Sequence, residues 1–219
     1  MKARINVVKM LVAAGTLAVA TGASAQSAGQ FTVSVGANML KPHVTSGPIS
    51  APALPNSLGD VSKETEPVAV ITYGVTDNIS VETAIGTPYK NKLYGAGAIS
   101  GTGQLGTVES LPAIALVQYR FFSPTSMVRP FVGLGVTYAM FRKETGSFAM
   151  TALTNPGGGT PTTFNIDNKW TYSGQVGLQF NINEKWFANA AFIKTKLSTD
   201  VHFSTNQQQH MKLDPDSYL

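Results

Sequence analysis

The chain has 219 residues, which corresponds to one domain or one domain with short extensions. It contains no cysteine, so disulfides, thiolate metal sites and cysteine nucleophiles are excluded. Charged residues make up only 13% of the chain, about half the usual fraction for a soluble domain. The net charge of +4 at first suggests an anionic partner such as nucleic acid.

The first 25 residues are predicted to be a secretory signal peptide. Lys2, Arg4 and Lys9 precede an apolar run of 11 residues, and an Ala-Ser-Ala sequence then ends at Ala25. A basic start, a short apolar centre and small residues before the cut are typical of export signals. A membrane anchor is the alternative, but a spanning helix needs about 20 residues. Cleavage leaves a mature domain, 26–219, with a net charge of +1, which argues against nucleic acid.

The mature chain is dominated by residues that alternate between apolar and polar or small, which is the period of a β-strand. In 131–140, for example, Val132 and Leu134 share one face, and Gly133 and Gly135 share the other. No stretch of the mature chain reaches the 18 apolar residues expected of a transmembrane helix. Seven segments are predicted to be strands: 31–38, 66–75, 79–86, 111–122, 131–140, 170–180 and 186–197.

The lengths of the strands and of their connections favour a membrane barrel over a soluble sandwich. Several segments have ten or more residues, which matches the roughly 9–11 residues of a transmembrane strand. Long extracellular loops and short periplasmic turns are typical of outer-membrane barrels. The connections alternate in this way, long at 42–63, 87–107 and 143–168, and short at 76–78, 123–129 and 181–185.

Closure of the barrel requires an eighth strand, because a sheet in lipid cannot leave an edge unpaired. Bacterial single-chain barrels also usually have an even number of strands. Beyond Val201 the chain offers only 212–219 for this strand. We therefore expect an all-β, eight-stranded antiparallel transmembrane β-barrel whose last strand is incomplete in this chain. Truncation of a longer chain is the favoured explanation, and a barrel that closes differently is the alternative.

In order and spacing, several motifs resemble the OmpW/AlkL family of eight-stranded outer-membrane proteins. They are Thr-Asp-Asn-Ile-Ser-Val-Glu at 76–82, Thr-Pro-Tyr-Lys-Asn-Lys at 87–92, Leu-Pro at 111–112, Arg-Pro-Phe-Val-Gly-Leu-Gly-Val at 129–136, Gly-Gln-Val-Gly at 174–177, Ile-Asn-Glu-Lys-Trp at 182–186 and Lys-Leu-Asp-Pro at 212–215. The resemblance covers the whole mature chain. It departs at the C-terminus, where family members continue through a final strand that ends in an aromatic residue.

The resemblance implies a barrel in the cell outer membrane with a narrow apolar channel, open outward and blocked toward the periplasm. Small hydrophobic molecules would enter from outside and leave sideways into the membrane through an opening in the wall. No cofactor and no energy source would be needed. The implied partners are outer-membrane lipid and small hydrophobic compounds, with the barrel-assembly machinery and periplasmic chaperones during biogenesis.

The residues themselves support a hydrophobic conduit in part. An eight-stranded barrel is just wide enough for side chains or one small ligand, and its predicted inner face carries few charges. Glu66, Glu82 and Arg120 are expected toward the periplasmic half, where they would pair as a plug. The predicted channel-lining residues are Val68, Val70, Glu82, Ile114, Leu116, Arg120, Gly133 and Gly135.

A lateral exit needs a weak place in the wall. Proline cannot donate a hydrogen bond to a strand ladder, and Pro88 and Pro112 lie beside the third and fourth predicted strands. They are therefore candidates for the lateral opening. Prolines that merely bend a strand or end its pairing are an equally good explanation.

Two other functions stay open. One is a structural or stress-response barrel of the OmpX type, acting as an adhesin or as a bacteriocin or phage receptor, which a charged and filled lumen would favour. The other is a membrane enzyme acting on lipid, which needs a nucleophile and a base within hydrogen-bond reach. The sequence has no G-x-S-x-G elbow and no histidine with metal-site spacing, so we expect no enzyme and no metal.

Overall fold

The computed structural model describes residues 27–183 and 185–219, so the predicted signal peptide lies outside the described residues. Almost every described element is a strand. Among these residues, no helix is both long and apolar enough to cross a membrane. The elements are β1 (Phe31–Lys41), β2 (Thr45–Ser46), β3 (Ser57–Val61), β4 (Glu64–Gly74), β5 (Ile79–Gly86), β6 (Tyr89–Gly97), β7 (Gln104–Arg120), β8 (Val128–Gly146), α2 (Phe148–Thr154), β9 (Phe164–Ile166), β10 (Lys169–Asn181), β11 (Phe187–Thr195), β12 (Ser198–Phe203), β13 (Gln208–Lys212) and β14 (Asp216–Tyr218).

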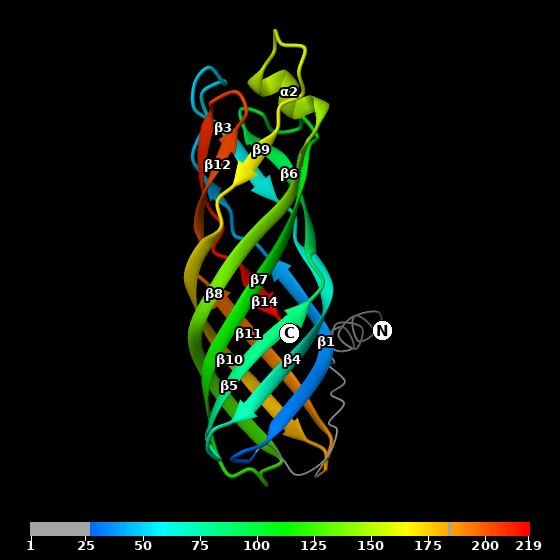
Figure 1. Cartoon of the computed structure of the whole chain (residues 1–219), viewed down its shortest axis with the longest axis vertical. Helices are drawn as coiled ribbons and strands as arrows, with labels where there is room; N and C mark the ends of the chain where they lie inside the picture. The colour runs from blue at the N-terminus through cyan, green and yellow to red at the C-terminus, as the bar shows by residue number, and fades with distance from the viewer. Residues whose placement is uncertain (1–26, 184) are drawn as a thin grey trace, which may run out of the picture.

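Eight antiparallel strands close into a ring in the order β1-β4-β5-β7-β8-β10-β11-β14, and β14 pairs back onto β1 (Figure 1). The seven segments predicted from alternation are all strands of this ring, so the eight-stranded barrel is confirmed. The eighth strand, β14, has three residues, which pair with 39–41 of β1 and 192–194 of β11.

The outer face of the ring is apolar, as the alternation predicts. On β8, the outward-facing Val132, Leu134 and Val136 are 43%, 75% and 50% exposed. The inward-facing Thr137 of the same strand is buried. On β10, Trp170 and Tyr172 are about as exposed as Leu134. A soluble protein would bury most of these large apolar side chains away from water. The exposed apolar belt is therefore the surface that meets lipid.

The three long connections are structured, which the sequence did not predict. They hold β2 and β3, then β6, and then α2 and β9. β6 pairs with the far end of β7, and β3 pairs with β6. A second sheet, β2-β13-β12-β9, forms at the same end of the molecule, where α2 also lies (Figure 1). Because the long connections of such barrels are extracellular, this end is the extracellular module.

The extracellular module has its own apolar core. Side chains from its separate segments pack together there, including Ile49, Ile99, Leu105, Met150 and Phe203. Each of these residues is less than 9% exposed, so its burial stabilises the module by about 1.5–3 kcal/mol per side chain. The barrel therefore continues as an ordered wall beyond the lipid-facing belt.

Candidate functional site: the barrel interior

The periplasmic half of the interior is filled by a hydrogen-bonded plug around Arg120. This side chain is 1% exposed. Its guanidinium donates to Ser80 Oγ at 3.0 Å, to Gln118 Oε1 at 2.7 Å and to Gln179 Oε1 at 2.6 Å. It also lies 4.0 Å from the carboxylate of Glu82 and 4.8 Å from the ring centroid of Phe131. The buried cation is therefore satisfied on every side, as its burial demands.

Two glutamines continue the plug across the inner wall. Gln118 Nε2 donates to Gln175 Oε1 at 2.6 Å, and Gln175 Nε2 donates to Glu82 Oε1 at 2.9 Å. The strand register places Gly133 of β8 directly between Gln118 of β7 and Gln175 of β10. Because Gly133 has no side chain, the two amides meet above it. Residues 118, 175 and 179 were not predicted as site residues, since neutral amides look like any other inward polar position.

Arg129 seals the interior near the periplasmic turns. Its side chain is fully buried and donates to the carbonyl oxygens of Asp77 at 2.5 Å and of Phe121 at 3.4 Å. It thereby ties the start of β8 to the β4–β5 turn. In the sequence it was the last residue of the short connection predicted at 123–129, and it was assigned no role.

The extracellular half of the interior is hollow and mainly apolar. It encloses a cavity of about 120 Å³, roughly enough for a small apolar molecule. Apolar side chains from most of the ring line it, among them Val68, Val70, Ile114, Ala139, Ile193 and Leu213. Glu82, which belongs to the plug, forms part of its floor.

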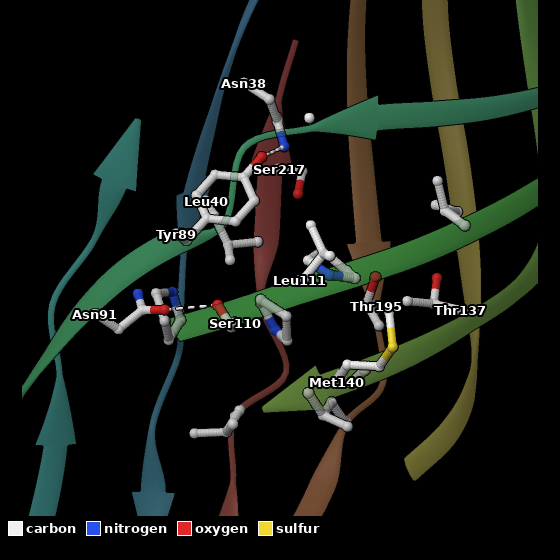
Figure 2. A pocket seen from close by; sticks show the side chains of 18 of the residues that line it. Asn38, Leu40, Tyr89, Asn91, Ser110, Leu111, Thr137, Met140, Thr195 and Ser217 are labelled. Atoms are coloured by element: carbon white, nitrogen blue, oxygen red, sulfur yellow. Dashed lines mark hydrogen bonds between the residues drawn. The ribbon is translucent and has the colours of Figure 1, made fainter. Parts of the chain in front are cut away.

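A few hydrogen-bonding side chains interrupt the apolar lining. Asn38 Nδ2 donates to Tyr89 Oη at 2.7 Å, and Ser110 Oγ donates to Asn91 Oδ1 at 2.6 Å (Figure 2). Both pairs join two strands across the cavity wall. Because most of these polar atoms are already paired, the cavity remains a favourable place for an apolar guest.

The wall of this cavity has a break between β5 and β6. β5 pairs with β7 up to Ala84 opposite Ile114, and β6 takes over at Tyr89 opposite Ser110. Residues 111–113 of β7 have no ladder partner on that side among the described strands. Gly86, Thr87, Leu111 and Pro112 border the break and also line the cavity. This interruption of the ladder, the wall break, is therefore part of the wall of the cavity.

The predicted site residues fall into three places. Val68, Val70, Glu82 and Ile114 line the cavity, and Arg120 organises the plug below it. Leu116 is 1% exposed in the interior, while Gly133 and Gly135 pack tightly in the wall between β7 and β10. Pro112 borders the wall break, and Pro88 is one of the two residues that separate β5 from β6.

The expectation that Glu66 joins the plug is wrong. Glu66 lies near the extracellular end of β4, opposite Asn38, and accepts a hydrogen bond from Thr87 Oγ1 at 2.8 Å. β4 enters from the extracellular side, so its early residues are far from the periplasm. Glu66 therefore stands beside the wall break.

The three histidines lie outside the barrel interior and each faces an aspartate. His43 pairs with Asp216 at 2.6 Å, and His210 with Asp200 at 2.7 Å. His202 lies 3.5 Å from Asp167. Within 27–183 and 185–219, no group of three or more His, Cys, Asp or Glu side chains could hold a metal ion.

Comparison with known proteins agrees with this architecture. The model of the OmpW family matches residues 27–218. Outer membrane protein W of Salmonella typhimurium is 32% identical over 201 residues, which cover 88% of this chain and 86% of that protein. Outer membrane protein AlkL of Ectopseudomonas oleovorans is 31% identical over 149 residues, which cover 68% of this chain and 59% of AlkL.

Solved structures show the same barrel. The crystal structure of OprG from Pseudomonas aeruginosa has a TM-score of 0.78 at 24% identity, covering 88% of this chain and 93% of OprG. The solid-state NMR structure of AlkL in DMPC bilayers has a TM-score of 0.62 at 25% identity, covering 90% of each chain. The chain therefore belongs to the OmpW family and is a β-barrel of the outer membrane.

Proposed function

We propose that this barrel gives small hydrophobic molecules a passive route from the cell exterior into the outer membrane. The observation that carries the proposal is an apolar cavity that is closed below and bordered on one side by the wall break. The plug around Arg120 blocks the periplasmic half, and the cavity above it reaches the wall break at Thr87 and Pro112. A guest would therefore leave into lipid and not into the periplasm.

The driving force of this route is partition alone. Transfer of apolar surface out of water is favourable by about 25 cal/mol per Å², so both the cavity and the membrane attract the same molecules. No cofactor or chemical step is part of the proposal, and the barrel would act without being an enzyme.

The structure bears on the rival of a purely structural barrel. A structural barrel would fill its lumen with interlocked polar and charged groups. The periplasmic half of this lumen is filled in that way, but the extracellular half is apolar and hollow. The hollow half favours the conduit over a barrel that only presents its extracellular module as an adhesin or receptor.

Uptake of a hydrophobic fluorescent probe by Gram-negative cells that lack other family members tests the cavity. Ala139→Trp places a large ring inside the cavity, because Ala139 is 5% exposed and lines it. The matched control is Ala115→Trp, at an exposed position of β7 that lies within both ladders and outside the wall break. We expect Ala139→Trp to abolish uptake and Ala115→Trp to retain it. Equal uptake by both variants would refute the conduit.

A second pair of variants tests the lateral exit. Thr87→Trp fills the wall break, and Thr83→Trp adds the same ring to the exposed outer face of β5. We expect Thr87→Trp to bind the probe when purified but to fail in cellular uptake, whereas Thr83→Trp does both. Normal uptake by Thr87→Trp would mean that the probe does not leave the cavity through the wall break, and it would refute the lateral exit.

A further inference from the structure

Three basic side chains gather on the outer wall immediately beyond the wall break between β5 and β6. The ladders place Lys90 of β6, Glu109 of β7 and Arg142 of β8 side by side in one row. Arg142 Nε lies 3.3 Å from one carboxylate oxygen of Glu109, and Lys143 Nζ lies 3.1 Å from the other. Arg142 and Lys143 keep 51% and 71% of their side chains exposed.

An irregularity in the β7–β8 ladder brings two consecutive cations to the same face. The register shifts between Thr107 and Glu109, and Lys143 has a φ of 52°. In a regular strand, consecutive side chains point to opposite faces. Here both Arg142 and Lys143 reach Glu109, so this row of the wall carries three cations against one carboxylate. The next acid on β8, Glu144, has a buried Oε1.

The row lies at the edge of the lipid-facing belt. Below it, the outward positions of β7 and β8 are uncharged and include Ala113, Val117 and Leu134, of which the last is 75% exposed. Glu109 is four residues from Ala113, which is about 13 Å along a strand. Long basic side chains at such an edge extend toward headgroups while their stems cover apolar surface. The cations therefore lie at the depth of lipid phosphates.

We propose that Lys90, Arg142 and Lys143 bind the phosphate of an outer-leaflet lipid beside the wall break. The planar guanidinium of Arg142 presents paired donors that fit phosphate oxygens. Lys90 directly follows Tyr89, the residue at which β6 begins to pair with β7. The bound lipid would stand beside the break between β5 and β6. The proposal rests on the membrane location of the barrel and not on the conduit.

A second basic cluster on the wall provides the matched control. Lys196 and Lys212 lie 3.7 and 3.6 Å from Asp214, and Lys194 Nζ lies 2.6 Å from Asp216. Lys196 and Lys212 are 54% and 53% exposed. Their charges are thus balanced by aspartates, although their number and exposure resemble those of the proposed site. They should contribute little to lipid binding.

The test measures binding of short-chain phosphatidic acid to the full chain in detergent by native mass spectrometry. Short-chain phosphatidylcholine and inorganic phosphate serve as comparison ligands. Each cation near a lipid surface contributes about 1 kcal/mol, which corresponds to about fivefold in affinity. We expect Lys90→Gln with Lys143→Gln to weaken phosphatidic acid binding by about fivefold per cation removed. Lys196→Gln with Lys212→Gln should leave it unchanged.

One substitution should act in the opposite direction, which no folding defect would imitate. Glu109→Gln removes the carboxylate that pairs with Arg142 and Lys143 and should tighten phosphatidic acid binding by about fivefold. The proposal is overturned if the control pair loses as much affinity as the Lys90 and Lys143 pair, or if Glu109→Gln does not tighten binding. Equal affinity for phosphatidylcholine, or for inorganic phosphate without acyl chains, would also overturn it.

Discussion

Removal of the Arg120 side chain should destabilise the barrel and open its periplasmic end. Hydrogen bonds to charged groups contribute about 1.5–3 kcal/mol each, and Arg120 donates three of them. The sum overestimates the loss, because the remaining amides can partly pair with one another or with water. Removing one partner of a buried ion pair costs about 3–5 kcal/mol. The 4.0 Å separation from Glu82 places Arg120→Ala at the lower end, about 3 kcal/mol.

Glu82→Ala should cost less, about 2 kcal/mol. Arg120 keeps its three neutral acceptors in this variant, which loses the bonds from Gln175 and Thr72 to the carboxylate and the 4.0 Å ion pair with Arg120. Because the two side chains belong to one network, the double variant should lose less stability than the two single variants together, by at least about 1 kcal/mol.

The assay is urea unfolding from lipid vesicles, followed by fluorescence of the two outward-facing tryptophans, with planar-bilayer conductance measured in parallel. The control is Lys196→Ala, because its exposed ion pair with Asp214 is worth at most about 1 kcal/mol. If Arg120→Ala loses less stability than this control and its conductance is unaltered, the interior arginine is not the centre of a plug. Additive losses in the double variant would refute the network.

Three further outcomes are expected from the structure. Gly135→Ala should cost about 1–3 kcal/mol of unfolding free energy, because the added methyl would overlap the Ala115 carbonyl of β7. Gly133→Ala should cost less, since the nearest atoms to its added methyl belong to glutamine side chains at 3.0 Å or more; urea titrations compare the two. His210 donates to Asp200 and holds the pKa of that carboxyl below its usual range. The stability that this pair contributes is present above the unfolded-state pKa of Asp200 and is lost as the pH falls through its lower folded-state pKa. Hydrogen exchange in β12 and β13 should therefore accelerate only in strong acid. Unchanged exchange in strong acid would contradict this expectation. Ser147→Ala should loosen α2 by about 1 kcal/mol, because the hydroxyl accepts from Met150 N at the start of the helix; exchange of the α2 amides should rise while barrel stability stays unchanged.

The barrel was predictable from the sequence because lipid imposes a strict pattern on its strands. Outward positions must be apolar, whereas some inward positions are polar or small. The alternation of the two kinds therefore predicts β5, β8 and β10 as strands. β6 was missed because its outward residues are Lys90 and Lys92 and its inward residues include Asn91. It lies beyond the apolar belt, where both faces can be polar and alternation carries no signal.

Only part of the interior was predictable: alternation placed Val68, Val70 and Ile114 on the inner face, and charge marked Glu82 and Arg120. Glu82 and Arg120 were identified as a pair because a charge inside a barrel needs a partner. The glutamines that connect them carry no such signal, since their meeting depends on the register that puts Gly133 between them. Glu66 was assigned to the wrong end of the barrel. Alternation predicts the face of β4 on which a residue lies, but the height of that residue in the membrane depends on the direction of the strand.

The long β7–β8 hairpin has a consequence for the order in which the barrel assembles. Its ladder begins with Arg120 opposite Phe131, which are 11 residues apart, and continues to Gly106 opposite Gly146. The β1–β14 ladder joins Lys41 to Asp216 across almost the whole chain. The entropy of loop closure makes the second contact more costly than the first by about 2.5 kcal/mol. The hairpin is thus a natural nucleus and ring closure a late event, so the apolar cavity comes into existence only in the last step of folding.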